Sequence, residues 1–322
     1  MRRIAFSAGR LRQLLLPACL LTTILSSYEK KYALLLLAVA SLSAKPTAQA
    51  QSFTKANRYL TVGAHLSAFN YFGDLTPRVS FASVRMAAVR PGFGFHVTQR
   101  LTPYVSVRGA LSFGRIAGSD KQAAGKDASY RYYRNLNFES NIQELAVVGI
   151  VDLIPNHMQA AYRMPVVPYV FGGIAAFHFN PKGTVDGGTI PAGLRPGAKV
   201  ELQPQRTEGH YYQRAQLAIP FGGGVRVKVA KNVNVGLELG WRKTFTDYLD
   251  DVSTTYTNLA NLSTPAARYF GNGITRTDQN TPAQMDVPGA LRGNSNQKDW
   301  YITTGVHVSY ILEKKLKTNK FR

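Results

Sequence analysis

Hydrophobic and polar residues alternate strictly along residues 233–242. The apolar parity carries Val233, Val235, Leu237, Leu239 and Trp241, and the other parity carries small, polar or charged residues. A period of two is the repeat of a β-strand whose two faces meet different surroundings. The apolar face ends in tryptophan, a residue that favours the membrane–water interface, so this pattern is typical of a strand that faces lipid.

The same alternation recurs in seven further segments. They are residues 59–69, 92–97, 104–114, 144–153, 169–179, 216–229 and 300–310. In each segment we assign the more apolar parity to lipid; in residues 169–179 this is the parity of Tyr169 and Phe171, which leaves His178 facing inward. Eight strands is an even number and the smallest size of outer-membrane barrels. The predicted fold is therefore all-β, an antiparallel up-and-down transmembrane β-barrel with eight strands.

The gaps between these segments alternate in length. The second, fourth and sixth gaps, residues 98–103, 154–168 and 230–232, are each shorter than the gaps on both sides. Outer-membrane barrels have short periplasmic turns and long extracellular loops, and an even strand number places both termini in the periplasm. The alternative is a soluble ligand-holding barrel of lipocalin type. It would bury large apolar residues inside and expose polar ones, which is the reverse of this pattern.

The N-terminal region indicates an export signal. A lysine pair precedes the apolar run 32–42, and a small-x-small pattern ends at Ala50, so we expect cleavage before Gln51. A second apolar run lies upstream, at residues 14–25. A lipoprotein-type cleavage site at Cys19 is the alternative.

Three parts follow from this organisation. We expect an N-terminal extension and a signal peptide in residues 1–50, with the working signal beginning near Tyr28. An outer-membrane barrel with long extracellular loops follows in residues 51–312, and a basic periplasmic tail in residues 313–322.

The chain is strongly basic, with a formal net charge of +21. Residues 1–50 hold seven Lys/Arg and one Glu, so their removal leaves about +15. The loop of residues 115–134 combines basic and tyrosine residues, a composition that also suits nucleic acid. An exported barrel presents this loop to phosphate-rich lipopolysaccharide instead. The expected partners are therefore outer-membrane lipid and lipopolysaccharide, and not nucleic acid.

Charged residues occupy the inward parity of several predicted strands. They are Arg108, Glu144, Asp152, Arg226, Lys228, Glu238 and Arg242. Side chains just fill the bore of an eight-stranded barrel. We therefore predict an internal network of ion pairs rather than the lining of a channel.

Neither a catalytic site nor a cofactor site is predicted. The sequence has no triad order or metalloprotease spacing that stands out, and the glycine-rich residues 172–173 and 221–224 lie inside strands. The only cysteine lies in the segment expected to be removed, which excludes disulfides and thiolate metal sites. The inward parity of different strands carries four histidines, His65, His96, His178 and His307. We favour packed, hydrogen-bonded histidines over a metal or catalytic site.

An acidic turn follows the strand of residues 233–242. Its central residues are Thr246, Asp247, Tyr248, Leu249, Asp250 and Asp251. We expect it at the surface, just beyond the outer end of the seventh strand, where its carboxylates hold the loop of residues 243–299 in place. A calcium or protein-docking site is the alternative, although three carboxylates are few for calcium unless backbone oxygens join them.

Three stretches resemble the PorG-type outer-membrane barrels of Bacteroidota. They are Tyr71-Phe72-Gly73-Asp74, PYVFGG at residues 168–173, and GWRKTFTDYLDDVS at residues 240–253, of which residues 246–253 are the most specific. The resemblance covers roughly residues 57–312. It implies a non-enzymatic barrel of the type IX secretion and gliding apparatus, linked to its periplasmic ring. A general structural or adhesion barrel, and a barrel enzyme acting on lipid or protein, remain as alternatives.

Overall fold

The computed structural model describes residues 57–75, 88–123, 134–272 and 287–312. The predicted signal with its cleavage before Gln51, and the basic tail of residues 313–322, lie outside these ranges. Among the described residues, no helix is both long enough and apolar enough to cross a membrane.

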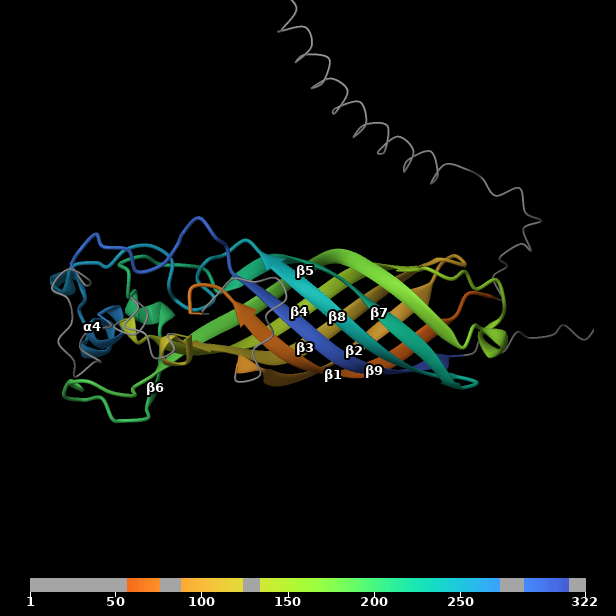
Figure 1. Cartoon of the computed structure of the whole chain (residues 1–322), viewed down its shortest axis with the longest axis horizontal. Coiled ribbons are helices and arrows are strands. Elements are labelled where there is room, and N and C mark those ends of the chain that lie inside the picture. The colour runs from red at the N-terminus through yellow and green to blue at the C-terminus, as the bar shows by residue number, and fades with distance from the viewer. Residues whose placement is uncertain (1–56, 76–87, 124–133, 273–286, 313–322) are drawn as a thin grey trace, which may run out of the picture. The chain divides into compact units, whose positions relative to one another are not determined.

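The described residues form long strands joined by loops with a few short helices (Figure 1). The strands are β1 (Leu60–Phe72), β2 (Arg90–Arg100), β3 (Val105–Ser119), β4 (Asn137–Asp152), β5 (Val166–Thr184), β6 (Lys199–Glu201), β7 (Ala215–Ala230), β8 (Val233–Thr244) and β9 (Trp300–Leu312). The helices are α2 (Asp120–Ala123), η3 (Ala160–Tyr162), η4 (Gln203–Gln205), η5 (Leu259–Asn261) and α4 (Pro265–Gly271).

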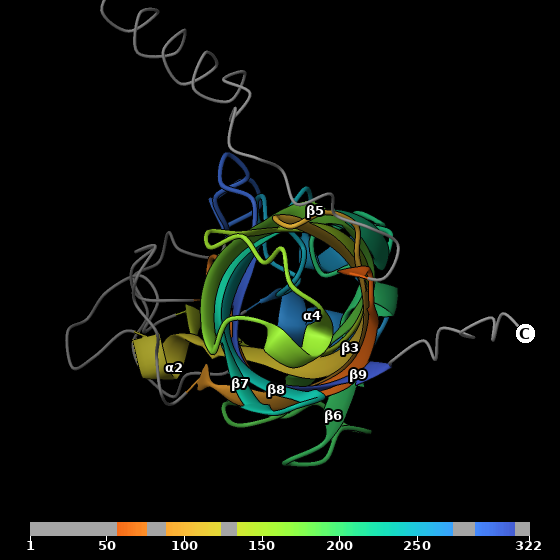
Figure 2. The ribbon, with the colours of Figure 1, turned by 90° about the vertical axis from the view of Figure 1, so that its right-hand side faces the viewer.

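Eight of the strands close into a barrel, which Figure 2 shows end-on. Within the described ranges its order is β1-β2-β3-β4-β5-β7-β8-β9, and β9 pairs again with β1. Every pairing is antiparallel. The short β6 adds only to the far end of β5. The predicted up-and-down barrel of eight strands is confirmed, and each predicted strand overlaps an observed one.

The two ends of the barrel carry connections of different length. Residues 101–104, 153–165 and 231–232 join strands at one end, and residues 73–89, 120–136, 185–214 and 245–299 join them at the other. Leu60 pairs with Leu312, so the chain enters and leaves the barrel at the short-turn end. This arrangement follows the predicted alternation of gap lengths.

The outer face of the barrel is an apolar band between aromatic residues. Leu66 is 72% exposed and Leu237 62% exposed on this face. Trp241 stacks on Phe221 towards the long-loop end, with ring centroids 6.0 Å apart. Tyr310 is exposed towards the opposite end. Such a band with aromatic girdles is the outer surface of a barrel in a bilayer.

The predicted faces of β5 are wrong, whereas those of the other seven barrel strands agree with the structure. Tyr169 and Phe171 point into the barrel, and His178 is exposed outside. Glycines on the neighbouring β7 explain this: a Cβ on Gly222 would lie 2.8 Å from the Phe171 ring, and one on Gly224 2.7 Å from the Tyr169 ring. These glycines make room for inward-facing aromatic rings. Alternation alone missed this because both faces of β5 contain apolar residues.

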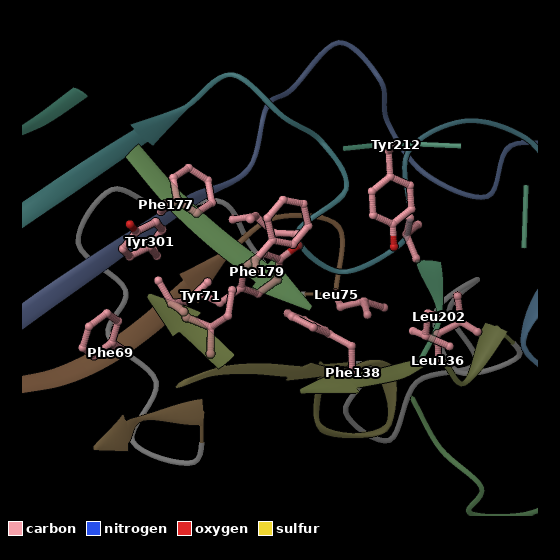
Figure 3. Close-up of a cluster of buried hydrophobic side chains, with 14 of the residues drawn as sticks. Phe69, Tyr71, Leu75, Leu136, Phe138, Phe177, Phe179, Leu202, Tyr212 and Tyr301 are labelled. Atoms are coloured by element: carbon pink, nitrogen blue, oxygen red, sulfur yellow. The ribbon is translucent and has the colours of Figure 1, made fainter. Parts of the chain in front are cut away.

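An aromatic cluster fills the barrel towards the long-loop end and continues into the loops (Figure 3). It includes Phe69, Tyr71, Leu75, Leu136, Phe138, Phe177, Phe179, Leu202, Tyr212 and Tyr301. The first and last of these belong to strands, whereas Leu202 and Tyr212 belong to the connection between β5 and β7. The long-loop end of the barrel and its loops therefore share one hydrophobic core.

Arginine on the outer face tests the lipid-facing assignment. Leu237 lies midway along β8, so Leu237→Arg should reduce the free energy of unfolding by about 2–4 kcal/mol in a lipid bilayer. The measurement is urea unfolding of the barrel in lipid vesicles, followed by tryptophan fluorescence.

Val229→Arg is the matched control, because Val229 faces outward beside the short turn at residues 231–232. There the same arginine should cost about 0–1 kcal/mol, since it reaches the interface. Equal costs at the two positions would contradict the membrane placement.

Candidate functional site

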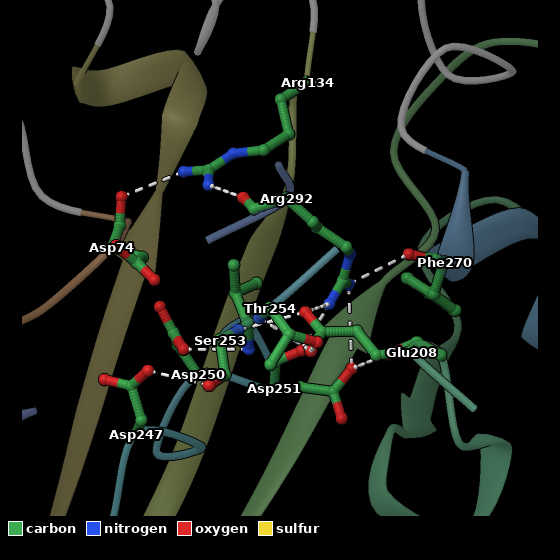
Figure 4. A network of polar contacts seen from close by, with 12 residues as sticks. Asp74, Arg134, Glu208, Asp247, Asp250, Asp251, Ser253, Thr254, Phe270 and Arg292 are labelled. Carbon is green, nitrogen blue, oxygen red and sulfur yellow. Dashed lines mark hydrogen bonds and ion pairs between the residues drawn. The ribbon is translucent and has the colours of Figure 1, made fainter. Parts of the chain in front are cut away.

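The described residues of the four long connections form a cap over the barrel, and Arg134 joins three of them (Figure 4). Its Nε and Nη2 each donate to a carboxylate oxygen of Asp120, at 2.7 Å. Nη1 donates to the carbonyl of Arg292 at 2.5 Å, and Nη2 to the carbonyl of Asp74 at 2.9 Å. Bidentate, charge-assisted bonds of this kind are among the strongest in proteins. Arg134 therefore links the β1–β2, β3–β4 and β8–β9 connections.

A second buried arginine brings in the remaining connection. Arg292 Nη1 donates to Glu208 Oε1 at 2.7 Å and to the carbonyl of Asp251 at 2.5 Å. Glu208 also accepts from the backbone N–H of Ser253 at 3.0 Å and of Thr254 at 2.9 Å. Glu208 lies between β5 and β7, so this pair fastens that connection to the one between β8 and β9.

The acidic turn lies beyond the end of β8 but is buried, so its predicted surface exposure is wrong. Asp247 is 3% exposed, and Asp250 and Asp251 are each 1% exposed. Asp251 accepts from the hydroxyls of Thr207 at 2.5 Å and Tyr212 at 2.7 Å. Because Thr207 and Tyr212 come from another connection, the turn holds the cap together from inside.

Tyr71, at the end of β1, lies between two carboxyl groups of the cap. Its hydroxyl oxygen is 2.6 Å from Asp250 Oδ2 and 3.0 Å from Asp299 Oδ1. A phenol has one proton and can donate to only one of them at a time. The other carboxyl therefore satisfies the contact best when it is itself protonated. Asp299 also accepts from the backbone N–H of Leu249 at 2.9 Å, which fixes the middle of the turn.

Burial sets the proton affinities of these carboxyl groups. It raises the pKa of Asp247 to about 7 and that of Asp251 to about 6, the latter against the opposing pull of Arg292. Burial likewise raises the pKa of Asp250 and Asp299 well above the usual range. Burial alone would raise the pKa of Glu208 too, but Arg292 and the hydrogen bonds from Thr254 and Ser253 lower it. Glu208 therefore stays ionised in mild acid.

Six of the seven charges predicted inside the barrel form ion pairs there. Arg108 Nη1 is 2.6 Å from Glu238 Oε2, and Arg242 Nε is 3.3 Å from Glu144 Oε2. A third group centres on Asp152, 2.6 Å from Arg226 and 2.9 Å from Arg100. Sequence reasoning missed Arg100 because it lay in a predicted turn.

Two basic residues close the short-turn end of the barrel. The ammonium of Lys228, predicted as part of the charge network, donates to the Ala161 carbonyl at 2.6 Å. Arg163, which sequence reasoning did not single out, donates to Asn234 Oδ1 at 2.8 Å and to the Val233 carbonyl at 2.9 Å. Both tie the β4–β5 connection across the mouth of the barrel.

Three of the four histidines predicted to face inward converge within the barrel. His65, His96 and His307 each offer a ring nitrogen within 4.8 Å of the others. His178 is exposed on the outer face, so its predicted position is wrong. Among the described residues, no acidic group of the turn belongs to a comparable set of three ligands.

Residues 34–260 match the family model of the outer membrane protein beta-barrel domain. The chain belongs to this family. Family and fold together place the barrel in the outer membrane. In such barrels the long loops face the cell exterior and the short turns face the periplasm, so the cap is extracellular.

Several solved outer membrane barrels are similar to this chain. Ail of Yersinia pestis is 9% identical, with 79% of this chain and 97% of Ail covered and a TM-score of 0.33. Neisserial surface protein A is 11% identical, with 78% and 96% covered and a TM-score of 0.35. OprG of Pseudomonas aeruginosa is 8% identical, with 81% and 98% covered and a TM-score of 0.33. No curated protein sequence matches significantly.

The raised pKa values predict that the cap of this outer membrane barrel is more stable in mild acid than at neutral pH. A carboxyl whose pKa is raised on folding contributes stability that is complete below the unfolded pKa, near 4, and is lost as pH rises through the folded pKa. For Asp251 and Asp247 this loss extends to about pH 6 and about pH 7. Cleavage of the cap by an added protease should therefore speed up between pH 5 and pH 8, by at most about tenfold per pH unit for each carboxyl.

Asp247→Asn is the control, because the amide is neutral throughout this range. In this variant the cleavage rate should depend less on pH near pH 7. The rates are first corrected for the pH dependence of the protease itself, measured on an unfolded substrate. A cap that is cleaved faster at pH 5 than at pH 8, or a profile that Asp247→Asn leaves unchanged, would contradict the assignment.

Proposed function

We propose that this chain is a non-enzymatic structural barrel that anchors a secretion assembly in the outer membrane. The observation that carries the proposal is the buried network of the cap, in which Arg134, Arg292 and Glu208 join all four long connections. A cap held in this way gives a fixed outer surface. It suits a scaffold better than a gate that must open.

The filled interior supports the same function. A conducting barrel needs a continuous polar passage, and an enzyme needs a cleft that its substrate can enter. In the described part of this barrel, ion pairs such as Arg108–Glu238 occupy the half near the short turns. Aromatic side chains occupy the half near the long loops. The surfaces that could meet a partner are the cap outside, the strands in lipid and the segments in the periplasm.

The resemblance of residues 240–253 to PorG-type barrels makes type IX secretion the proposed assembly, with its periplasmic ring as the partner. The chain leaves β9 at Leu312, at the periplasmic end. The basic residues 313–322 follow directly, outside the described residues. We propose this tail as the contact to an acidic surface of the ring.

Lipopolysaccharide is the second proposed partner, on the outer half of the barrel. A groove of about 500 Å³ lies on this face, lined by residues that include Trp241, Trp300, Lys243 and Lys298. The Lys243 ammonium lies 5.6 Å from the centre of the Trp300 ring. Lysines beside an aromatic girdle suit the phosphates and acyl chains of this lipid. A general outer-membrane structural barrel would use the same surface.

Removal of the positive charge of the tail tests the anchoring function. Replacement of the four tail lysines, at positions 314, 315, 317 and 320, by glutamine should reduce co-purification of the ring protein by at least about fivefold, because the attraction between opposite charges is lost. Replacement by arginine keeps the charge and should preserve co-purification. The proteins are isolated from membranes in mild detergent without lysine-reactive crosslinkers, and partners are quantified by mass spectrometry.

Deletion of the gene should in parallel block release of type IX cargo, and the wild-type gene should restore it. Normal cargo release after deletion, with no periplasmic ring protein in the wild-type preparation, would contradict the secretion function and favour the general structural barrel.

A further inference from the structure

Three histidines from neighbouring strands meet at one level inside the barrel. His65 on β1 is the cross-strand partner of His307 on β9, and His96 on the other neighbour, β2, is paired with Gly63. The ring centroids of His65 and His307 are 5.3 Å apart, and those of His96 and His307 5.5 Å apart. One ring nitrogen of each lies within 4.8 Å of the others. Strand pairing across the closure of the barrel therefore assembles a three-imidazole group.

One ring nitrogen of each histidine has no partner in the protein. The Nδ1 atoms of His65, His96 and His307 are all buried and have no hydrogen-bond partner. His65 Nε2 is 3.2 Å from Ser112 Oγ. Most buried polar side-chain atoms have a partner, and an exception needs an explanation such as an ion. Three such atoms in one cluster point to a ligand.

Glycines opposite the histidines create the space that the rings occupy. A Cβ on Gly94, the cross-strand partner of His65, would lie 2.6 Å from the His65 ring. A Cβ on Gly63 would lie 2.6 Å from His96 Nε2. A cavity of about 30 Å³ lies among the three histidines and Glu238. That volume suits a single water molecule or a single ion.

A carboxylate lies beside the cluster. Glu238 Oε1 is 3.6 Å from His307 Nε2. Its other oxygen accepts from Arg108 at 2.6 Å and from the Tyr169 hydroxyl at 2.9 Å, which fixes the carboxylate in place. Glu238 is thus oriented by its neighbours, as carboxylates near metal ions commonly are.

We propose that His65, His96 and His307 each give one ring nitrogen to a single transition-metal ion of the zinc class, with the Glu238 carboxylate beside the site. Imidazole suits zinc, copper and nickel, and three histidines with one oxygen form a common tetrahedral set. Zn–N bonds of about 2.0–2.1 Å need nitrogens about 3.4 Å apart, so nitrogens up to 4.8 Å apart must approach by up to about 1.4 Å. The ion would connect β1 to β9, the first and last strands. It would thereby stabilise the pairing that closes the barrel.

The space next to the cluster continues towards the periplasmic end of the barrel. His96 and His307 also line a second cavity of about 30 Å³, which extends past Thr98 to Tyr59 at the start of the barrel. Arg108 lines both cavities, and Arg100 and Arg226 also line the second. Glu238 offsets the charge of Arg108, and Asp152 is shared by Arg100 and Arg226, so the second cavity is polar with one positive charge in excess.

Zinc content of the purified protein tests the proposal, and the chain offers a matched control. The chain has six histidines. The cluster variant replaces His65, His96 and His307 by Ala, and the control variant replaces His157, His178 and His210, all exposed, by Ala. The chains are refolded in detergent without a histidine tag, stripped with EDTA, dialysed against Zn²⁺ and analysed by mass spectrometry of the metal. Wild type and control should hold about one zinc per chain, and the cluster variant less than about a tenth.

Binding of Co²⁺ should in addition give the intense visible bands of tetrahedral coordination in wild type and control alone. Folding of each variant is checked by the heat-dependent gel mobility of the barrel. Should the cluster variant not fold, His96→Asn takes its place and should weaken zinc binding at least tenfold. An intact wild-type barrel that holds no more zinc than the variant overturns the proposal.

Discussion

The structure depends on how buried carboxyl groups in the cap find partners. A lone ionised carboxylate in an apolar interior is too costly to persist, so it must be paired, hydrogen-bonded or protonated. The cap uses all three solutions: Arg292 pairs with Glu208, Tyr71 hydrogen-bonds to Asp250, and Asp247 has its pKa raised to about 7. The Glu208–Arg292 pair comes from two different connections and Tyr71 from β1, so displacement of these described residues would leave buried groups unsatisfied.

The interior of the barrel differs between its two ends. Towards the periplasm the described side chains form ion pairs such as Arg108–Glu238. Towards the exterior it is aromatic and continues into the cap, so that Phe179 of β5 stacks on Tyr212 of a loop with ring centroids 6.1 Å apart. The outer half therefore resembles the core of a soluble domain placed on a membrane barrel. Lipid covers the strands, whereas the protein's own side chains cover the acidic turn.

The sequence was sufficient to predict the barrel because the pattern of each strand can be recognised within the strand itself. Alternation with a period of two separates lipid-facing Leu237 from inward-facing Glu238, and loop lengths distinguish the two ends. Alternation predicted the wrong faces for β5, because the glycines that make room for Tyr169 and Phe171 lie on another strand.

Burial of the acidic turn could not be predicted for a related reason. Arg292 lies 41 residues from Asp251, and nothing in the sequence around either residue indicates that they meet. Likewise, alternation placed four histidines inside. Strand register brings three of them together, whereas the reversed faces of β5 leave His178 outside.

Hydrogen–deuterium exchange in lipid bilayers tests the central claim, that the cap is a fixed part of the barrel. Amides of the acidic turn donate to buried oxygens: Leu249 to Asp299 and Ser253 to Glu208. Residues 246–253 should therefore exchange about as slowly as β8, and far more slowly than the exposed residues Ala192, Gly193 and Arg195. Exchange of residues 246–253 at the rate of these three residues, with the strands still protected, would contradict the account.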